Sequence, residues 1–134
     1  MQLNRFRIFM PLLILLHSIV SCNEAKYMQG KRTYDIMCGD CHMEDGSGVK
    51  NLYPQLKPLN SAVLANNIPC IIKYGLNREI SLIKMPSNPS LKAVDITNIM
   101  NYLLNDLNNG YNKEYTLTEV EELLNSCKAD KLEK

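Results

Sequence analysis

The chain has 134 residues, of which 46% are hydrophobic and 22% charged, a composition that indicates one globular domain and excludes an intrinsically disordered chain. Its formal net charge is +1 and the basic residues form no block, so nucleic acid is not expected as a partner. The chain also contains five cysteines, whose roles have to be inferred from their positions.

Residues 1–21 are predicted to be a signal peptide. Two arginines precede an apolar run from Ile8 to Val20, which is shorter than a membrane-spanning helix needs. The run ends in Ile19-Val20-Ser21-Cys22, which resembles the lipobox of bacterial lipoproteins. That resemblance implies a lipid anchor on Cys22, a mature protein of 113 residues (134 − 21), and a location on the periplasmic side of a membrane. The alternatives are a permanent anchor helix, or cleavage without lipid that leaves a free extracellular thiol.

Residues 24–37 are predicted to form the first helix of the domain. Four residues recur at helical spacing and define one face of this helix: Tyr27, Gly30, Tyr34 and Met37. Because glycine is unfavourable inside a helix, Gly30 predicts a close approach by another backbone.

The sequence Cys38-Gly39-Asp40-Cys41-His42, a C-x-x-C-H motif, follows this helix directly. Two thiols at this spacing can add to the two vinyl groups along one edge of a haem, and the next histidine can then ligate the iron. The motif therefore predicts one haem c attached through Cys38 and Cys41, with His42 as an iron ligand. The small Gly39 and the polar Asp40 suit a tight turn around the macrocycle.

The residues after the motif contain several helix breakers. The sequence Asp45-Gly46-Ser47-Gly48 is predicted to be a loop, and its two glycines allow positive φ angles. Pro54 and Pro58 are expected to keep the following residues extended.

Two short helices are predicted in the middle of the chain. The first covers residues 62–66 and is capped by Asn60 or Ser61. The second covers residues 70–74, with Pro69 at its start and Gly75 at its end. Residues 77–90 are predicted to be a loop.

A strong helix is predicted over residues 92–108, and one face of it is apolar: Ile96, Ile99, Tyr102 and Leu103. Lys92 stands where a serine or threonine cap is usual, so Ser90 is expected to cap this helix instead.

A last helix is predicted over about residues 117–128. Thr116 and Glu119 form a capping box at its start. Its apolar stripe consists of Leu117, Val120, Leu123, Leu124 and Cys127. Since no segment alternates as a β-strand does, the predicted fold class is all-α, in a single domain over residues 22–134.

An iron held by one histidine needs a second axial ligand or stays open to small molecules. His17 leaves with the signal peptide, so His42 is the only histidine of the mature chain. Met37 and Met43 flank the motif, whereas Met85 lies 43 residues beyond His42 in a loop and is followed by a proline. A thioether ligand also raises the reduction potential of haem iron relative to histidine. Met85 is therefore the predicted second ligand, and filling of the core is its alternative role.

Taken together, the motifs resemble the class I cytochrome c family over about residues 26–107. The matching features are Gly30, Tyr34, the C-x-x-C-H motif, Gly46-Ser47-Gly48, Pro54, Met85-Pro86 and Tyr102. The resemblance implies a cytochrome c-like fold of short helices around one covalent haem. It further implies that the first and later helices cross at Gly30 near Tyr102, and that Pro54 lies against His42.

Residues 71–76 and the extra C-terminal helix are similar, more narrowly, to small lipoprotein cytochromes c of Bacteroidetes-type bacteria. This similarity adds Tyr74 to Pro54 as an expected residue of the haem pocket.

Cys70 and Cys127 remain after one cysteine is assigned to lipid and two to haem. In an oxidising compartment these two are predicted to form a disulfide. Two separate buried thiols are the alternative.

The predicted function is a monomeric, lipid-anchored electron carrier of an extracytoplasmic respiratory chain, not an enzyme, with other redox proteins as partners. One alternative is an open-site haem protein for small gases or peroxide, although no second histidine is present for peroxide chemistry. Another is a zinc or dithiol protein that uses Cys38 and Cys41. Four lysines are expected to be solvated surface: Lys50, Lys57, Lys73 and Lys84. The alternative is that they surround the exposed haem edge and meet an acidic partner.

Overall fold

The computed structural model describes residues 26–50, 52–59, 62–76, 83–107 and 111–127. These ranges contain helices and two isolated β-bridges but no strand, so the all-α prediction is confirmed for them. The helices in chain order are α2 (Met28–Met37), α3 (Gly39–His42), α4 (Ala62–Tyr74), α5 (Ala93–Asn101), the π-helical η1 (Tyr102–Leu107) and α6 (Leu117–Ser126). The predicted signal peptide and Cys22 lie outside the described residues. Among the described helices, none has the length and apolar character to cross a membrane.

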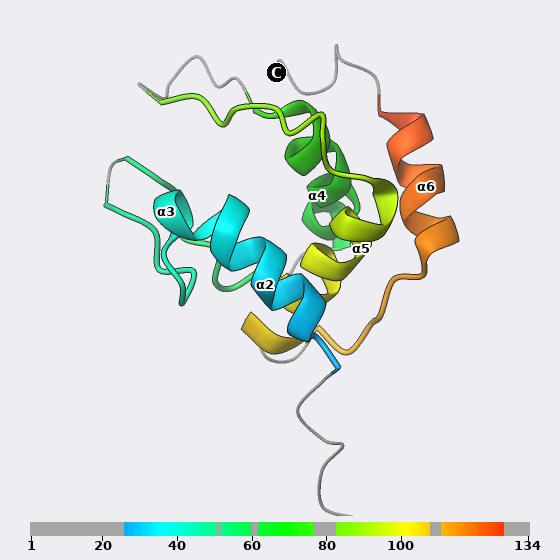
Figure 1. The fold of residues 1–134 in the computed structure, drawn as a ribbon, viewed down its shortest axis with the longest axis horizontal. Helices are drawn as coiled ribbons and strands as arrows, with labels where there is room; N and C mark the ends of the chain where they lie inside the picture. Colours follow the sequence, from blue (N-terminus) through cyan, green and yellow to red (C-terminus); the bar gives the residue numbers. More distant parts are fainter. Residues whose placement is uncertain (1–25, 51, 60–61, 77–82, 108–110, 128–134) are drawn as a thin grey trace, which may run out of the picture.

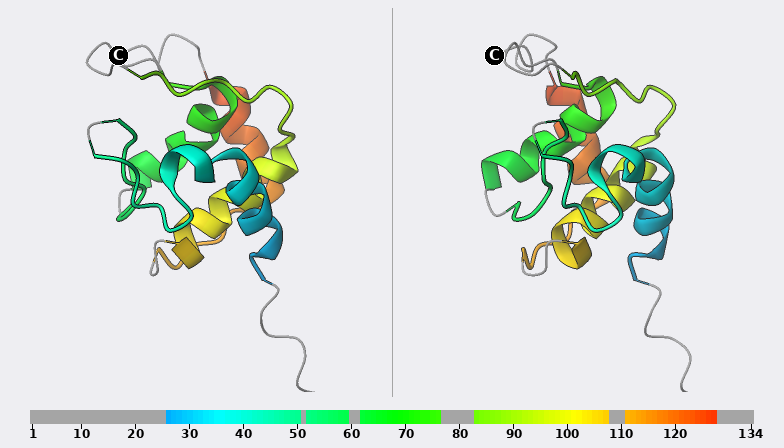
Figure 2. Two further views of the ribbon diagram at one scale, coloured as in Figure 1. Left: turned by 60° about the vertical axis from the view of Figure 1, so that its left-hand side comes forward. Right: turned by 90° about the vertical axis from the view of Figure 1, so that its left-hand side faces the viewer.

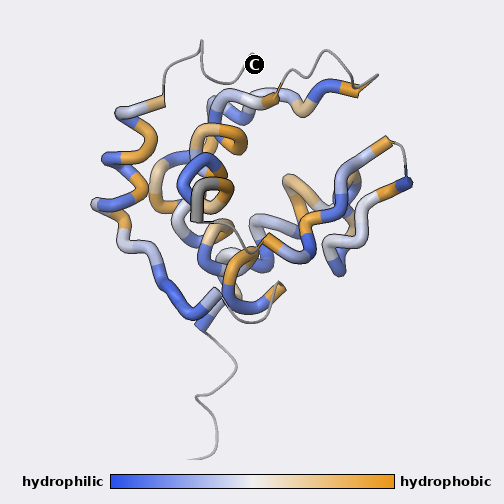
Figure 3. The backbone as a smooth tube through the Cα atoms, turned by 180° about the vertical axis from the view of Figure 1, so that it is seen from behind, coloured by the Kyte–Doolittle hydropathy of each residue, from blue (hydrophilic) through white to orange (hydrophobic). Residues whose placement is uncertain are grey.

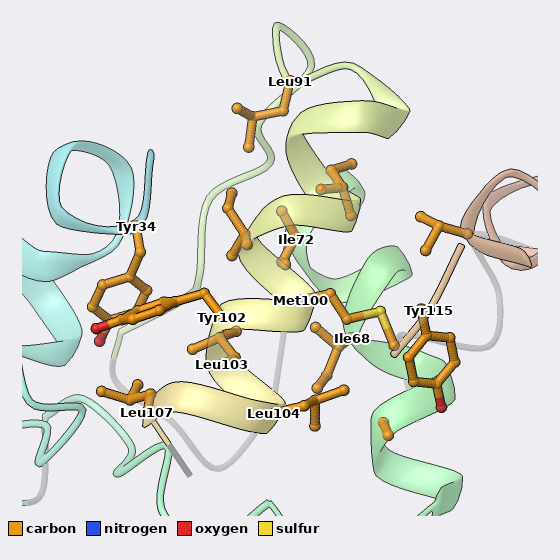
Figure 4. Packing of buried hydrophobic residues seen from close by; sticks show 14 residues of the cluster. Tyr34, Ile68, Ile72, Leu91, Met100, Tyr102, Leu103, Leu104, Leu107 and Tyr115 are labelled. Atoms are coloured by element: carbon orange, nitrogen blue, oxygen red, sulfur yellow. The ribbon is translucent and has the colours of Figure 1, made fainter. Parts of the chain in front are cut away.

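The core is built around α5 and η1, which contact α2, α4 and α6 (Figure 1). Figure 4 shows their side chains meeting those of α2 and α4. The predicted apolar face is confirmed, since all four of its residues are buried: Ile96, Ile99, Tyr102 and Leu103. Burial of this face is what mainly stabilises the helix, because short helices in isolation are only marginally stable in water.

The crossing of α2 and α5 depends on Gly30. A Cβ at this position would lie 2.0 Å from the carbonyl oxygen of Asn98 and 2.7 Å from the Cβ of Tyr102. The predicted close backbone approach is therefore confirmed. Tyr34, one turn along α2, places its ring 5.4 Å from the ring of Tyr102 (Figure 4). The helix begins later than predicted, however, because Lys26 and Tyr27 form a turn that precedes it.

The prediction of two short helices around Pro69 is wrong, because α4 is a single helix that contains this proline. Proline lacks the N–H that would donate to the carbonyl of Ala65, which normally breaks a helix. Here Ala65 and Pro69 are both fully buried, and Ile68 and Ile72 pack into the core beside them. Tertiary packing thus offsets the missing hydrogen bond. The proposed caps at residues 60 and 61 lie outside the described residues.

The predicted helix over residues 92–108 changes character at Tyr102, where η1 begins. The side-chain amide of Asn105 donates to the carbonyl of Asn101, with 3.2 Å between the two atoms. In a regular α-helix that carbonyl would accept the backbone N–H of Asn105, so an inserted side chain accounts for the wider turn. The start also differs from the prediction, since Lys92 and not Ser90 is the N-cap. The Asp95 carboxylate accepts the Lys92 backbone N–H at 2.9 Å.

The last helix, α6, begins as predicted with a capping box. Thr116 donates its backbone N–H to the Glu119 carboxylate at 2.7 Å, and the Thr116 hydroxyl accepts the Glu119 N–H at 3.2 Å. Hydrophobic and hydrophilic positions alternate along this helix in Figure 3. Val120 is fully buried and Leu123 and Leu124 pack against the core, but Leu117 is 42% exposed and does not belong to the buried stripe.

The far end of α6 is bonded to α4, because the structure joins Cys70 and Cys127 as a disulfide with their Cα atoms 5.7 Å apart. The bond closes a chain segment with a sequence separation of 57 residues. In the chain-entropy account, a loop of this length restricts the unfolded state enough to stabilise the protein by about 4 kcal/mol.

Replacement of both Cys70 and Cys127 by serine is therefore expected to lower the free energy of unfolding by about 4 kcal/mol. Chemical denaturation of the parent and the double variant under non-reducing conditions measures this change. Equal stabilities, together with two thiols that react with an alkylating reagent in the unreduced parent, would contradict the bond.

Candidate functional site

The C-x-x-C-H motif forms the corner between α2 and α3. The N–H of Cys38 donates to the Tyr34 carbonyl at 2.8 Å, which continues α2 by one bond. The N–H groups of Cys41 and His42 then both donate to the Cys38 carbonyl, at 3.2 and 2.9 Å. Both thiols consequently lie within one helical turn, where residues three apart share a face.

Neither thiol of the motif is bonded to another cysteine, and both are half-buried. Burial, together with the neighbouring Cys41 thiol, raises the pKa of Cys38 to about 11. The neighbouring Cys41 thiol raises the pKa of Tyr53. A dithiol oxidoreductase needs the opposite, a thiol whose pKa is lowered so that the thiolate forms near neutral pH. The environment of Cys38 therefore argues against that alternative.

The ring of His42 is held by the backbone carbonyl of Pro54. Its Nδ1 atom lies 3.0 Å from the Pro54 oxygen, and the residue is only 8% exposed. A carbonyl can only accept, so Nδ1 carries the proton, and in the neutral imidazole tautomer this leaves Nε2 as the nitrogen with a lone pair. This is the arrangement found in metal-ligating histidines, whose second nitrogen donates to a carbonyl or carboxylate.

The loop after α3 brings Pro54 back to the histidine. Gly46 and Gly48 have φ angles of 71° and 63°, as their positions predicted. The N–H of Gly48 donates to the His42 carbonyl at 3.0 Å, and the N–H of Leu56 donates to the Gly46 carbonyl at 2.8 Å. A Cβ on Gly48 would lie 2.5 Å from the Tyr53 oxygen, so only glycine permits this return of the chain.

Tyr34 fixes the other end of the same loop. Its buried hydroxyl donates to the carbonyl of Met43, with 2.7 Å between the oxygens. Met43 follows His42 directly and has a φ angle of 64°, an uncommon value for a residue with a side chain. The hydrogen bond from Tyr34 helps to hold the chain in this conformation, and burial raises the pKa of the tyrosine so that it stays a donor.

Met85 and Tyr74 belong to a different part of the molecule. The segment over residues 83–91 runs along one end of the ribbon, above α3 and its loop in Figures 1 and 2. There, Met85 exchanges two backbone hydrogen bonds with Leu76, each 3.0 Å long, just beyond α4. The Met85 side chain is half-buried, and Tyr74 is 51% exposed.

The structure thus gathers Cys38, Cys41, His42 and Pro54 into one site. Met85 lies apart from it on the segment over residues 83–91, and Tyr74 lies at the end of α4. Among the other methionines, Met100 is fully buried in the core, so core filling accounts for it. Met85 lies outside that core cluster and has no such role.

A zinc site built from the motif and the other two cysteines gains no support. Cys70 and Cys127 are bonded to each other. Among the described residues, no three histidine, cysteine, aspartate or glutamate side chains are grouped so that they could hold a metal ion.

The contacts of two residues, one in the site and one at the end of α4, were missed by reasoning from the sequence. Tyr53 contacts Cys41, and no motif signalled this contact. Lys73, expected to be solvated, is half-buried, and its ammonium donates to two backbone carbonyls, at 3.0 and 2.7 Å.

The chain was compared with protein-family models and with curated proteins. No protein-family model matches the chain, and no curated protein matches it significantly. The function is therefore inferred from the residues and their geometry.

Proposed function

We propose that the protein is a c-type cytochrome with a cytochrome c-like fold, which carries single electrons between other redox proteins. The observation that carries the proposal is the His42 ring. It follows a C-x-x-C pair directly, is buried, and has its Nδ1 committed to the Pro54 carbonyl 3.0 Å away. That hydrogen bond leaves Nε2 as the ligating atom and fixes the plane of the ring.

The residues present are chemically suited to haem c. Cys38 and Cys41 are unpaired thiols in one helical turn and would form the two thioether bonds. His42 would ligate the iron on one side. When bound, the haem supplies one-electron chemistry at its iron. The chain contributes covalent attachment, a fixed histidine ring and a partly apolar surrounding.

Met85 is the proposed second iron ligand. Three observations support it: Met85 lies outside the core cluster, its backbone is fixed by the pair of hydrogen bonds with Leu76, and its thioether is a soft ligand. With both axial positions filled, the iron would change oxidation state without binding a substrate. This distinguishes an electron carrier from a gas-binding or peroxidatic haem protein.

The proposal extends to location on the basis of the sequence alone. A lipid on Cys22 would tether the domain to a membrane on the periplasmic side, where c-type attachment takes place and the Cys70–Cys127 disulfide is compatible with the redox conditions. The donor and acceptor would then be components of a respiratory chain at that membrane.

Absorption spectroscopy of the protein made in a host that attaches haem c tests the ligand assignment. We expect the oxidised protein to show the weak far-red band of a sulfur–iron bond, and Met85→Ala to lose it and to bind carbon monoxide readily when reduced. Met28→Ala, which replaces an exposed methionine of α2, is the matched control and should keep the band. A parent protein that lacks the band and binds carbon monoxide without displacing a ligand would favour the open-site alternative.

A further inference from the structure

The end of α4 and the segment that carries Met85 are joined by a group of polar contacts that the proposed function does not by itself require. The segment over residues 83–91 pairs with Leu76 at Met85 and then follows the last turn of α4 towards α5 (Figure 1). The contacts come from both sides of this junction. They involve Lys73 on α4 and Asn88 on the segment.

Lys73 reaches from α4 across to the returning chain. Its Nζ donates to the Leu91 carbonyl at 2.7 Å and to the Pro89 carbonyl at 3.0 Å. The side chain is half-buried, so these bonds are partly shielded from water. Hydrogen bonds from a charged donor are stronger than those between neutral groups.

Asn88 makes the reciprocal contacts, from the segment to α4. Its backbone N–H donates to the Lys73 carbonyl at 3.1 Å, and its side-chain amide donates to the Ile72 carbonyl at 3.2 Å. Both carbonyls belong to the last turn of the helix, where they have no partner within the helix. The segment therefore caps α4, while α4 fixes the segment.

Gly75 brings the two backbones into contact. It has a φ angle of 78°, and a Cβ at this position would lie 2.4 Å from the Met85 carbonyl oxygen. Any other residue would push the segment away from α4. The backbone of Met85 is thus held by Leu76 and Gly75 on one side and, three residues later, by the Asn88 and Lys73 contacts.

We propose that Lys73 and Asn88 are positioning residues for Met85, which hold the thioether at the iron by fixing its segment to the end of α4. This inference depends on the proposed function, because it assigns the contacts to the second iron ligand. It also gives a role to a lysine that would otherwise be counted as surface. If the contacts are lost, Met85 should leave the iron more often, and an external ligand should compete better.

The test compares Lys73→Leu and Asn88→Ala with Lys73→Arg, which keeps the donors, and with Lys84→Leu. Lys84 is an exposed lysine of the same segment, adjacent to Met85, and serves as the matched control. Two quantities are measured on the haem-loaded protein. One is the hydrogen-exchange rate of the Met85 and Leu76 amides, with the buried Ile99 amide of α5 as an internal reference. The other is the apparent affinity for added imidazole.

In Lys73→Leu and Asn88→Ala we expect the Met85 and Leu76 amides to exchange about tenfold faster and imidazole to bind about tenfold more tightly, with Ile99 unchanged. Lys73→Arg and Lys84→Leu should stay within about threefold of the parent in both measurements.

Unchanged exchange of the Met85 and Leu76 amides in Lys73→Leu and Asn88→Ala would overturn the inference. Faster exchange with unchanged imidazole affinity would also overturn it, because the contacts would then hold a loop and not a ligand. A parent protein without the sulfur–iron band would contradict the proposed ligand itself. That failure is separable, since amide exchange is measured independently of the iron.

Discussion

The double variant Cys38→Ser/Cys41→Ser is expected to contain no covalently bound haem. Both thiols lie in the single turn that ends at His42, and neither is bonded to another cysteine. A hydroxyl cannot replace a thiol in the thioether bond, so the whole of the covalent haem should be lost. The measurement is haem staining of the denatured protein after electrophoresis, when only covalently held haem stays with the chain.

The matched control is Cys70→Ser/Cys127→Ser, which also removes two cysteines. These residues form the bond between α4 and α6, so this variant should lose stability but retain its haem. Haem that survives denaturation in the Cys38→Ser/Cys41→Ser variant would refute the assignment of the two thiols. Loss of haem in both variants would point to a general failure of folding.

The second large effect is expected at Gly30, where α2 crosses α5. A methyl group here would lie 2.0 Å from the Asn98 carbonyl oxygen and 2.7 Å from its carbon, and both atoms belong to the backbone. The two helices would have to separate in the middle of the core. We expect Gly30→Ala to lower the free energy of unfolding by about 3 kcal/mol, the upper part of the usual range for overpacking.

Gly39→Ala provides the control, because the nearest atom to a Cβ at Gly39 is the Tyr34 oxygen at 3.8 Å, an ordinary contact. This variant should stay within about 0.5 kcal/mol of the parent. Thermal or chemical denaturation of both variants measures the difference. If Gly30→Ala were as stable as Gly39→Ala, the close crossing of α2 and α5 would be incorrect.

Local signals in the sequence were sufficient for several features of the fold. Gly30 indicated a close approach by another backbone, and the Thr116–Glu119 capping box indicated the start of α6, because each signal depends on the residue itself or on its close neighbours. The glycines after the motif likewise fixed the loop that returns to His42. These features need no knowledge of distant parts of the chain.

Other features depend on long-range packing, which residue patterns do not reveal. From the sequence, Pro69 is predicted to start a helix. In the structure it lies inside α4, where it is buried beside Ala65. The widened turn at η1 arises from the side chain of Asn105, which donates to the Asn101 carbonyl. The sequence does not show which acceptor this side chain will take, because many are possible. Lys73 reads as a surface residue because its two acceptors, the carbonyls of Pro89 and Leu91, are 16 and 18 residues away.

In the candidate site, too, some features depend on neighbouring residues and others on contacts with distant parts of the chain. The pentapeptide at Cys38–His42 is a local motif, and its proposed haem chemistry was inferred from the spacing of its residues alone. The residues that surround the pentapeptide could be predicted only in part. The contact of Pro54 with His42 followed from a family resemblance, whereas nothing in the sequence indicated that Tyr53 lies beside Cys41. The contacts that fix the Met85 segment were not predicted, because they join the end of α4 to backbone carbonyls of a loop.

Covalent attachment of one haem at Cys38 and Cys41 is tested by the intact mass of the protein with its parent sequence, purified from a host that attaches haem c and then denatured and reduced. We expect this mass to exceed that of the processed polypeptide, with any lipid included, by one haem, and a fragment spanning Cys38 to His42 to carry this addition. A polypeptide mass without the haem, with Cys38 and Cys41 both open to alkylation, would contradict it.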